Sequence, residues 1–412
     1  MRSNYKRLGD YIELVDERNT ELSVDLLLGL TIEKKFIPSV ANIVGTNMKN
    51  YKIIRKNQFA CSTMQVRRDK KMPVAILKDF EEAIISQAYP VFQVMDESLL
   101  DPDYLMMWFT RAEFDRQATF HAVGGVRGSL EWEDFLDFEL PIPYIEKQRE
   151  IVEEYNTVTN RIKLNEQLNQ KLEETAQALY KHWFVDFEFP NEEGKPYKSS
   201  GGAMVYNEEL DKEIPVGWEV KSFTEKFKLG GGGTPKTNEE KYWNGDILFF
   251  TPADRSESYY CIETEKKITI KGLNESSTKI YPKDTVFITA RGTVGAISIA
   301  GFSMAMNQSC YSINGDNKFF AHQTTLDAIK KLKKEAVGAV FNALVTKDFD
   351  SQSVINPSFD VEEKFETRIS IIYEVLLSKL MVNQKLSELQ SVLLSKMSRV
   401  EKAISNKKVL CN

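Results

Sequence analysis

The chain has 412 residues, enough for two or three domains that each bury a core. Its hydrophobic share of 42% and charged share of 28% are those of an ordinary globular protein, and no apolar run approaches the roughly 18 residues of a membrane-spanning helix. The formal net charge of −6 disfavours a nucleic-acid partner only weakly, because the local distribution of charge determines such binding.

Residues 1–142 are predicted to form a first α+β domain. Short β-type runs fall at residues 59–61, 73–77 and 89–94, and a helical stretch follows at 104–120. The first seven residues precede no apolar core, so we expect no signal peptide and a cytoplasmic protein that contacts no membrane. The four cysteines are far apart, which predicts reduced thiols and no metal site.

This first segment contains a dense basic cluster. Between Lys49 and Lys71, eight lysine and arginine residues accompany a single acid, Asp69. Such cations neutralise phosphates, and interleaved Gln, Ser and Thr side chains can bind base edges. A solvated charged loop is the alternative. The candidate DNA contacts here are Lys52, Lys56, Gln65, Arg67, Arg68, Lys70 and Lys71.

A long helix is predicted over residues 143–184, because Pro143 suits a first helical position. Its apolar positions alternate steps of four and three, which is the heptad seam of a coiled coil. The seam residues are Ile151, Tyr155, Val158, Ile162, Asn169, Leu172 and Leu179. A buried asparagine in such a seam fixes register at some cost in stability. Residues 185–215, rich in Gly, Ser, Pro and charge, are predicted to be an irregular linker.

Residues 216–355 are predicted to form a second α+β domain. The β-type runs lie at 247–250, 285–289 and 295–299, and a helix is expected at 323–335. The glycine run 230–233 lacks the Gly-Lys-Ser/Thr order of a phosphate-binding loop, so we expect a flexible loop near a ligand surface.

A second basic strand-loop in this domain has Arg291 at its tip, with lysines around it. Contact with DNA is one reading of this arginine, and a surface ion pair is the other. The candidate DNA contacts in this half are Thr234, Lys236, Lys267, Arg291, Thr293, Asn307 and Gln308.

A second long helix is predicted over residues 356–405, and it repeats the first. Asn169-Gln170-Lys171-Leu172 recurs 214 positions later as Asn383-Gln384-Lys385-Leu386. The seam recurs at the same offset, with Ile369, Ile372, Leu376, Asn383, Leu386 and Leu393. Repetition at one offset indicates a tandem duplication. If a twofold axis relates the halves, the helices pair antiparallel; two unrelated surface helices are the alternative.

Several motifs follow one another along almost the whole chain. They include Pro141-Ile142-Pro143 with Gln148, Trp183-Phe184-Val185-Asp186-Phe187, Gly232-Gly233-Thr234-Pro235, Tyr242-Trp243-Asn244-Gly245-Asp246, and Arg291-Gly292-Thr293-Val294-Gly295. Together they resemble the specificity (S, HsdS) subunit of type I restriction–modification systems. The start of the second helix departs from the family pattern, because Asn356-Pro357-Ser358 replaces a double proline and Glu362 stands in place of Gln.

The resemblance implies two target-recognition domains joined by two long antiparallel coiled-coil helices with pseudo-twofold symmetry. It implies a non-catalytic reader of double-stranded DNA, in which each domain reads half of a bipartite target and the helices fix the gap. The implied partners are two methyltransferase (M) subunits, which would use S-adenosylmethionine, and motor-nuclease (R) subunits; the chain itself would need no cofactor.

Three alternatives stay open from the sequence. The first is the specificity subunit of a related system with fused restriction and methylation. The second is a coiled-coil scaffold without a DNA function, and the third is an enzyme that uses the glycine run 230–233 for a nucleotide.

Overall fold

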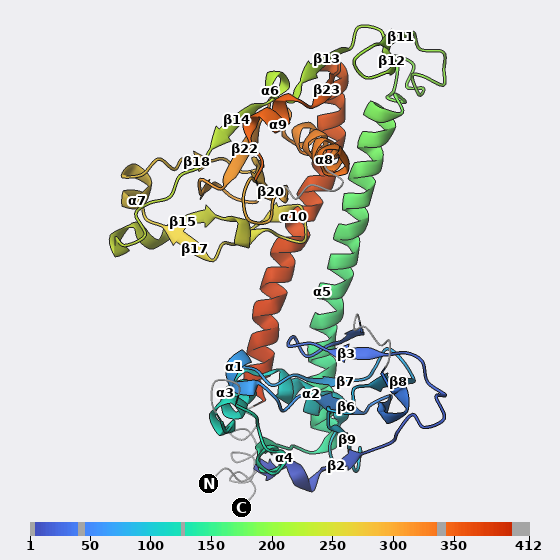
Figure 1. Cartoon of the computed structure of the whole chain (residues 1–412), viewed down its shortest axis with the longest axis vertical. Coiled ribbons are helices and arrows are strands. Elements are labelled where there is room, and N and C mark those ends of the chain that lie inside the picture. Colours follow the sequence, from blue (N-terminus) through green and yellow to red (C-terminus); the bar gives the residue numbers. More distant parts are fainter. Residues whose placement is uncertain (1–4, 40–45, 125–127, 336–342, 398–412) are drawn as a thin grey trace, which may run out of the picture. The chain divides into compact units, whose positions relative to one another are not determined.

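The computed structural model describes residues 5–39, 46–124, 128–335 and 343–397 (Figure 1). The chain divides into two compact units, Met1–Arg161 with Leu386–Asn412 and Ile162–Lys385, called unit 1 and unit 2 below. Helices α5 (Ile145–Tyr180) and α10 (Phe359–Lys396) each contribute residues to both units. Both units mix helix and sheet, as the sequence predicts.

Unit 1 is built on the antiparallel sheet β2-β9-β6-β7. An aromatic core lies against it, with Phe59 stacked on Phe92 at 5.0 Å and Phe109 edge-on to both. The strands are β1 (Tyr5–Arg7), β2 (Ile12–Val15), β3 (Leu28–Leu30), β4 (Phe36–Pro38), β5 (Lys52–Arg55), β6 (Phe59–Cys61), β7 (Val74–Ile76), β8 (Glu82–Ile85), β9 (Val91–Val94) and β10 (Glu139–Pro141). The helices are α1 (Val66–Asp69), α2 (Pro102–Thr110), α3 (Ala112–His121) and α4 (Trp132–Leu136).

Unit 2 contains a five-stranded sheet, β14-β22-β19-β20-β16, and a four-stranded sheet, β17-β15-β21-β18. Its strands are β11 (Met204–Asn207), β12 (Lys212–Pro215), β13 (Glu219–Ser222), β14 (Lys228–Gly231), β15 (Trp243–Phe250), β16 (Tyr260–Cys261), β17 (Lys266–Ile268), β18 (Ile280–Tyr281), β19 (Val286–Thr289), β20 (Ile297–Ala300), β21 (Met304–Met306), β22 (Cys310–Asn314) and β23 (Ser353–Asn356). Its shorter helices are α6 (Phe223–Lys226), α7 (Ile270–Asn274), α8 (Lys318–Glu335) and α9 (Thr346–Asp350).

Several boundaries differ from the sequence-based expectation. The stretch 104–120 is two helices, α2 and α3, which are interrupted at Arg111 in an extended conformation. The first long helix begins at Ile145 rather than 143, and a π-helical turn, Lys181–Val185, follows its end at Tyr180. The second begins at Phe359 rather than 356, and residues 398–405 of the expected helix lie outside the described residues.

The linker is more ordered than its composition predicts. Strands β11 and β12 form a hairpin within it, and the buried ring of Phe189 stacks on Trp218 at 4.9 Å. Phe187 is buried beside the same tryptophan. Aromatic burial therefore folds a segment whose glycine and charge content suggested irregular structure.

The two long helices pack on each other inside each unit (Figure 1). In unit 2, Asn165 Nδ2 donates to Asn383 Oδ1 at 2.7 Å. Asn169 Nδ2 donates to the Leu376 carbonyl at 3.4 Å, and Asn383 Nδ2 donates to the Ile162 carbonyl at 3.2 Å. In unit 1, Gln390 Nε2 donates to Thr159 Oγ1 at 2.8 Å. All thirteen predicted seam residues are buried or half-buried.

The first turns of the long helices are anchored by different polar groups. In unit 1, buried Gln148 accepts from the Asp101 amide at 2.9 Å and donates to the Pro143 carbonyl at 2.7 Å. In unit 2, Glu362 accepts from Lys226 Nζ at 2.6 Å and from Asn317 Nδ2 at 3.0 Å. The departure of Glu362 from the family pattern is thus matched by a cation, since a buried carboxylate requires a partner.

Helix α8 is fixed to the long helices by a buried polar network. His322 Nδ1 lies 2.6 Å from the Tyr373 hydroxyl, which also accepts from Gln323 Nε2 at 2.8 Å. The Tyr180 hydroxyl donates to Thr324 Oγ1 at 3.2 Å. The network links α8 to both α10 and α5, and its burial lowers the pKa of His322 to about 3.

This pKa predicts a dependence of stability on pH. An unfolded histidine titrates near pH 6.5, so between pH 6.5 and 3 the unfolded chain binds more protons than the folded one. The free energy of unfolding should fall as the pH falls through this window, by up to about 1.4 kcal/mol per pH unit from this group. Denaturant unfolding at pH 7 and pH 5 measures this change in the free energy of unfolding.

His322→Gln should reduce the loss of stability between pH 7 and pH 5, whereas substitution of the exposed His182 by Gln should leave that loss unchanged. Equal pH dependence in all three proteins would contradict the burial.

Candidate nucleic-acid interface

Three loops of unit 2 meet beyond the ends of β14, β19 and β21, and we call loops 232–237, 290–295 and 307–309 the three-loop surface. The Gly233 amide donates to the Met306 carbonyl at 3.1 Å, and the Thr234 hydroxyl donates to Gln308 Oε1. The amides of Ala290 and Arg291 donate to the Ser309 carbonyl at 2.7 and 3.3 Å. The structure therefore brings together most of the contacts predicted for this half.

The glycine run packs closely against neighbouring backbone and side chains. A Cβ atom on Gly232 would lie 2.0 Å from the Asn307 carbonyl oxygen, and one on Gly233 would lie 2.2 Å from Ser277 Oγ. Only glycine allows so close an approach of two backbone segments. Gly230 and Gly231 belong to strand β14 and pair with Ser312 and Tyr311, so this part is not the flexible loop that we expected.

The loop that carries Arg291 is held from inside by Thr289. This threonine is fully buried; its hydroxyl donates to the Thr293 carbonyl and accepts from the Ala296 amide, the latter at 3.0 Å. Gly292 and Gly295 have φ angles of +79° and +72°, which favour glycine. The Arg291 side chain is exposed and makes no ion pair with any residue that the structure describes. Its cation is therefore available to a ligand.

The remaining candidates of unit 2 lie at two places. Lys236 and Thr293 are exposed on the three-loop surface. Lys267 is exposed on β17, which is separated from β21 by β15 in the four-stranded sheet. Lys267 therefore lies outside the three loops, although its neighbour Ile268 pairs with Trp243, whose indole donates to the Lys236 carbonyl at 3.1 Å.

In unit 1 the predicted contacts divide into two groups. The Lys52 side chain is 11% exposed and lies 3.5 Å from Asp16, and Lys56 lies 2.5 Å from Glu81. Lys52 therefore fits an internal ion pair better than the direct phosphate contact that we predicted. The sequence pattern did not reveal these pairs because their acids lie outside the cluster.

The second group, from Gln65 to Lys71, forms one turn around the four-residue helix α1. Gln65 and Lys70, at its two ends, have φ angles of +63° and +52°. A non-glycine residue in this region is strained, and such strain is concentrated at functional sites. Arg67, Arg68, Lys70 and Lys71 are exposed on this basic turn, although Arg68 also pairs with Asp69 at 2.6 Å.

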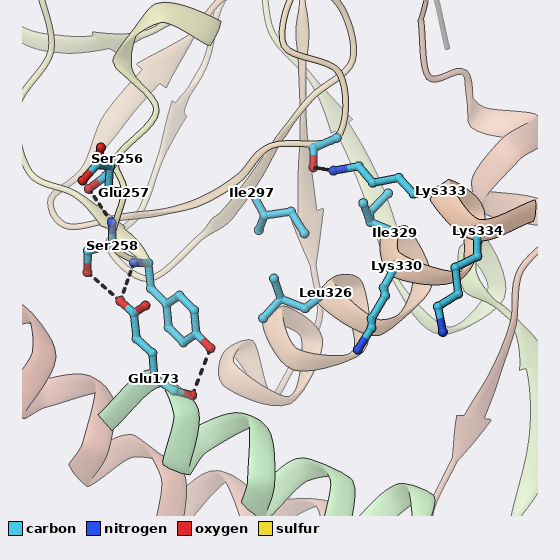
Figure 2. Close-up of a pocket in the computed structure, with 12 residues that line it drawn as sticks. Glu173, Ser256, Glu257, Ser258, Ile297, Leu326, Ile329, Lys330, Lys333 and Lys334 are labelled. Atoms are coloured by element: carbon cyan, nitrogen blue, oxygen red, sulfur yellow. Dashed lines mark hydrogen bonds between the residues drawn. The ribbon is translucent and has the colours of Figure 1, made fainter. Parts of the chain in front are cut away.

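A further group of cations lies outside the residues predicted from the sequence. Lys330, Lys333 and Lys334 of α8 line a pocket of about 620 Å³ in unit 2 (Figure 2). Their signal in the sequence was a run of four lysines in five positions, 330–334, which is otherwise typical of a solvated helix face.

Chemistry that would indicate catalysis is sparse in the described ranges. Within them, no three His, Cys, Asp or Glu side chains gather as metal ligands. Cys61, Cys261 and Cys310 are buried and unpaired, and burial raises the pKa of the Cys261 and Cys310 thiols to about 12. Thiols of this kind are inert. As for membranes, none of the helices described here is long and apolar enough to cross one.

Comparison with known proteins identifies the family to which the chain belongs. The sequence model of the type I restriction modification DNA specificity domain matches residues 39–174 and 215–391. The chain belongs to this family. The model matches twice, and each match ends inside a long helix, as a duplicated chain requires.

Individual members of the family resemble the chain along different lengths. The specificity subunit of type I restriction enzyme HindI from Haemophilus influenzae is 23% identical, over 90% of this chain and 92% of that protein. The specificity subunit of type I restriction enzyme MjaIX from Methanocaldococcus jannaschii is 28% identical, over 66% and 63%. The crystal structure of the S subunit of a type I system from M. genitalium superposes with a TM-score of 0.56 at 15% identity, over 95% of each chain. The fold is therefore that of a specificity subunit.

The Arg291 loop gives a direct test of the site geometry. Thr289→Val removes the buried hydroxyl at nearly constant volume and leaves the Ala296 amide with only the longer contact to the Thr293 carbonyl, at 3.4 Å. We expect the free energy of unfolding in urea to fall by about 1–3 kcal/mol. The matched control is Thr293→Val in the same loop, whose exposed side chain should change stability by less than about 0.5 kcal/mol. Equal effects of the two substitutions would contradict the role of Thr289.

Proposed function

We propose that this chain is the DNA-recognition subunit of a type I restriction–modification complex. The observation that carries the proposal is the match of the DNA specificity family to both halves of the chain. The three-loop surface of unit 2 and the basic turn of unit 1 are the surfaces on which each half would contact DNA. Their exposed arginines and lysines suit phosphates and guanine edges, and their polar neighbours suit other base edges.

The two halves are proposed to be related by a pseudo-twofold axis between antiparallel long helices. The support is a pair of hydrogen bonds. Asn169 donates to the carbonyl of Leu376, and Asn383 donates to the carbonyl of Ile162. Residues 169 and 383, like 162 and 376, are 214 positions apart, so the sequence repeat converts one bond into the other. Symmetric partners of this kind are expected of an antiparallel pair that arose by duplication.

The domain organisation of the proposal is the one that the sequence predicts. Two recognition domains, 1–142 and 216–355, alternate with the long helices 143–184 and 356–405, and 185–215 connects the halves. Each domain would read one half-site, and the helices would set the length of the gap between them, because half-site spacing reflects the geometry of the protein that holds the two readers.

The partners in the proposal are two methyltransferase subunits and the motor-nuclease subunits, and the bound nucleic acid is double-stranded DNA with a bipartite site. In unit 2 the long helices expose apolar side chains away from their own seam. Leu164 and Leu168 on α5 are 55% and 40% exposed, and Met381 and Val382 on α10 are 41% and 40% exposed. Clustered apolar exposure of this type suits a protein partner. The methyl donor, S-adenosylmethionine, would be bound by the methyltransferases, and this chain would supply recognition without catalysis.

The acidic net charge is compatible with DNA binding because of where the acids lie. Residues 185–215 contain eight acidic residues and three lysines, a balance of −5 within the total of −6. The rest of the chain is therefore close to neutral, and its basic surfaces are not opposed by a general excess of acids.

Methylation mapping tests the function. Cells that contain the chain and its methyltransferase partner should acquire adenine methylation at a bipartite motif that disappears without the chain. Arg291→Ala should relax one half-site by about 1–3 kcal/mol and leave the other unchanged, because only one domain contains the residue. The control is Lys241→Ala, whose exposed cation is paired with Glu239 at 2.8 Å and should have no effect. Equal relaxation of both half-sites, or the absence of any motif, would contradict the proposal.

A further inference from the structure

The pocket of about 620 Å³ in unit 2 has walls of opposite character. Figure 2 shows Lys330, Lys333 and Lys334 extending from α8 on one side, and Glu173 of α5 with the segment 256–258 on the other. Ile297, Leu326 and Ile329 form its apolar floor between them. We call the face formed by Lys330, Lys333 and Lys334 the basic wall; Gly295, at the end of loop 290–295, also lines the pocket, so the basic wall adjoins the three-loop surface.

The basic wall touches the loop that presents Arg291. Lys333 Nζ donates to the Gly295 carbonyl at 3.2 Å. A Cβ atom on Gly295 would lie 3.1 Å from Lys333 Cε and 3.3 Å from Ile329 Cγ2, so this glycine allows α8 to pack against the end of the loop. A ligand on the wall would therefore lie close to the segment whose tip is Arg291.

Two cations of the wall are unused within the protein. Lys330 and Lys334 are exposed, one helical turn apart, and neither has a hydrogen bond or ion pair with a residue that the structure describes. Lys331, between them in sequence, differs because it pairs with Asp327 at 2.9 Å. Among the described residues, the ammonium groups of Lys330 and Lys334 are therefore unpaired, whereas that of Lys331 is neutralised by Asp327.

The acids of the opposite wall do not neutralise these lysines. Glu173 accepts from Ser258 Oγ at 2.8 Å and from the Tyr259 amide at 3.0 Å, and burial raises the pKa of its carboxyl. Glu257 is exposed and has no partner among the described residues. Its carboxylate would repel an anion in the pocket. Removal of this charge should therefore strengthen anion binding, whereas removal of the lysine charges should weaken it.

We propose that Lys330 and Lys334 anchor DNA phosphates beside the half-site read by the second domain, with Lys333 as a positioning residue for the Arg291 loop. The inference rests on the proposed function and deepens it. Phosphate contacts supply affinity and orientation without sequence information, whereas base contacts supply specificity. The two roles would be divided between α8 and the three-loop surface.

The experiment measures equilibrium DNA binding by the complex of this chain with its methyltransferase partner over a series of salt concentrations. Duplexes with the cognate motif and with a scrambled sequence are compared. The double substitution Lys330→Ala with Lys334→Ala should weaken binding to both duplexes by the same factor. The slope of log affinity against log salt should become shallower by about 1.8, because each released phosphate contact accounts for about 0.9.

Three further variants make the result specific. Lys331→Ala is the matched control on the same helix and should change neither affinity nor slope. Glu257→Gln should strengthen binding to both duplexes at low salt, and it keeps the test valid if the double substitution destabilises α8. Arg291→Ala should weaken binding to the cognate duplex and leave the scrambled one almost unchanged.

Two outcomes would overturn the inference while the proposed function stands. One is an unchanged salt slope in the double variant, with cognate binding intact. The other is a lower melting temperature with an unchanged slope, because lysines near a helix C-terminus also stabilise the helix dipole. Failure of the unsubstituted complex to bind either duplex would instead contradict the proposed function itself.

Discussion

The hydrogen bonds of the paired asparagines are the constraint on which the rest of unit 2 depends. Asn169 and Asn383 lie, together with buried Asn165, among apolar seam residues, where an amide without a partner costs about 1–3 kcal/mol. Asn169 Nδ2 donates to the Leu376 carbonyl at 3.4 Å and Asn383 Nδ2 donates to the Ile162 carbonyl at 3.2 Å, each about two turns from the counterpart asparagine, whereas Asn169 Oδ1 is buried without a partner among the described residues. A slip of one turn would break both bonds together, so the register of α5 on α10 is specified by polarity as well as by packing.

That register positions the three-loop surface through α8. The His322–Tyr373 contact and the Tyr180–Thr324 bond attach α8 to both long helices. Lys333 and Gly295 then join α8 to the Arg291 loop, and Ser309 joins that loop to Asn307 and Gln308. An unbroken series of contacts therefore leads from the seam of unit 2 to its exposed cation.

Local and periodic features could be predicted from the sequence, and features that depend on distant partners could not. The seam residues follow a heptad pattern, so the long helices were found to within a few residues at their starts. The ion pair of Lys52 could not be predicted, because its partner, Asp16, is 36 positions away in the sequence. The glycine run predicts a flexible loop from its sequence alone, because its close approach to Asn307 is a tertiary contact. The lysines of α8 gain their significance only from the fold, which places Lys333 against Gly295 at the end of the Arg291 loop.

Specificity is expected where the duplication has diverged. The helices keep the repeat because both copies must fit one register, whereas unit 1 presents a strained basic turn and unit 2 presents three joined loops. Even the helix anchors have changed, from the amide of Gln148 to the carboxylate of Glu362 with its cation Lys226. Two different readers on a common helical frame are what an asymmetric bipartite target requires.

The central claim is that the helices set the distance between two independent readers. The most direct test inserts one heptad in each long helix, between Arg161 and Ile162 and between Lys385 and Leu386, and maps methylation in cells with the methyltransferase partner. Seven residues lengthen a helix by about 10 Å, which corresponds to about three base pairs. The account predicts unchanged half-sites separated by a longer gap. A folded variant that methylates the original motif with its original gap would contradict it.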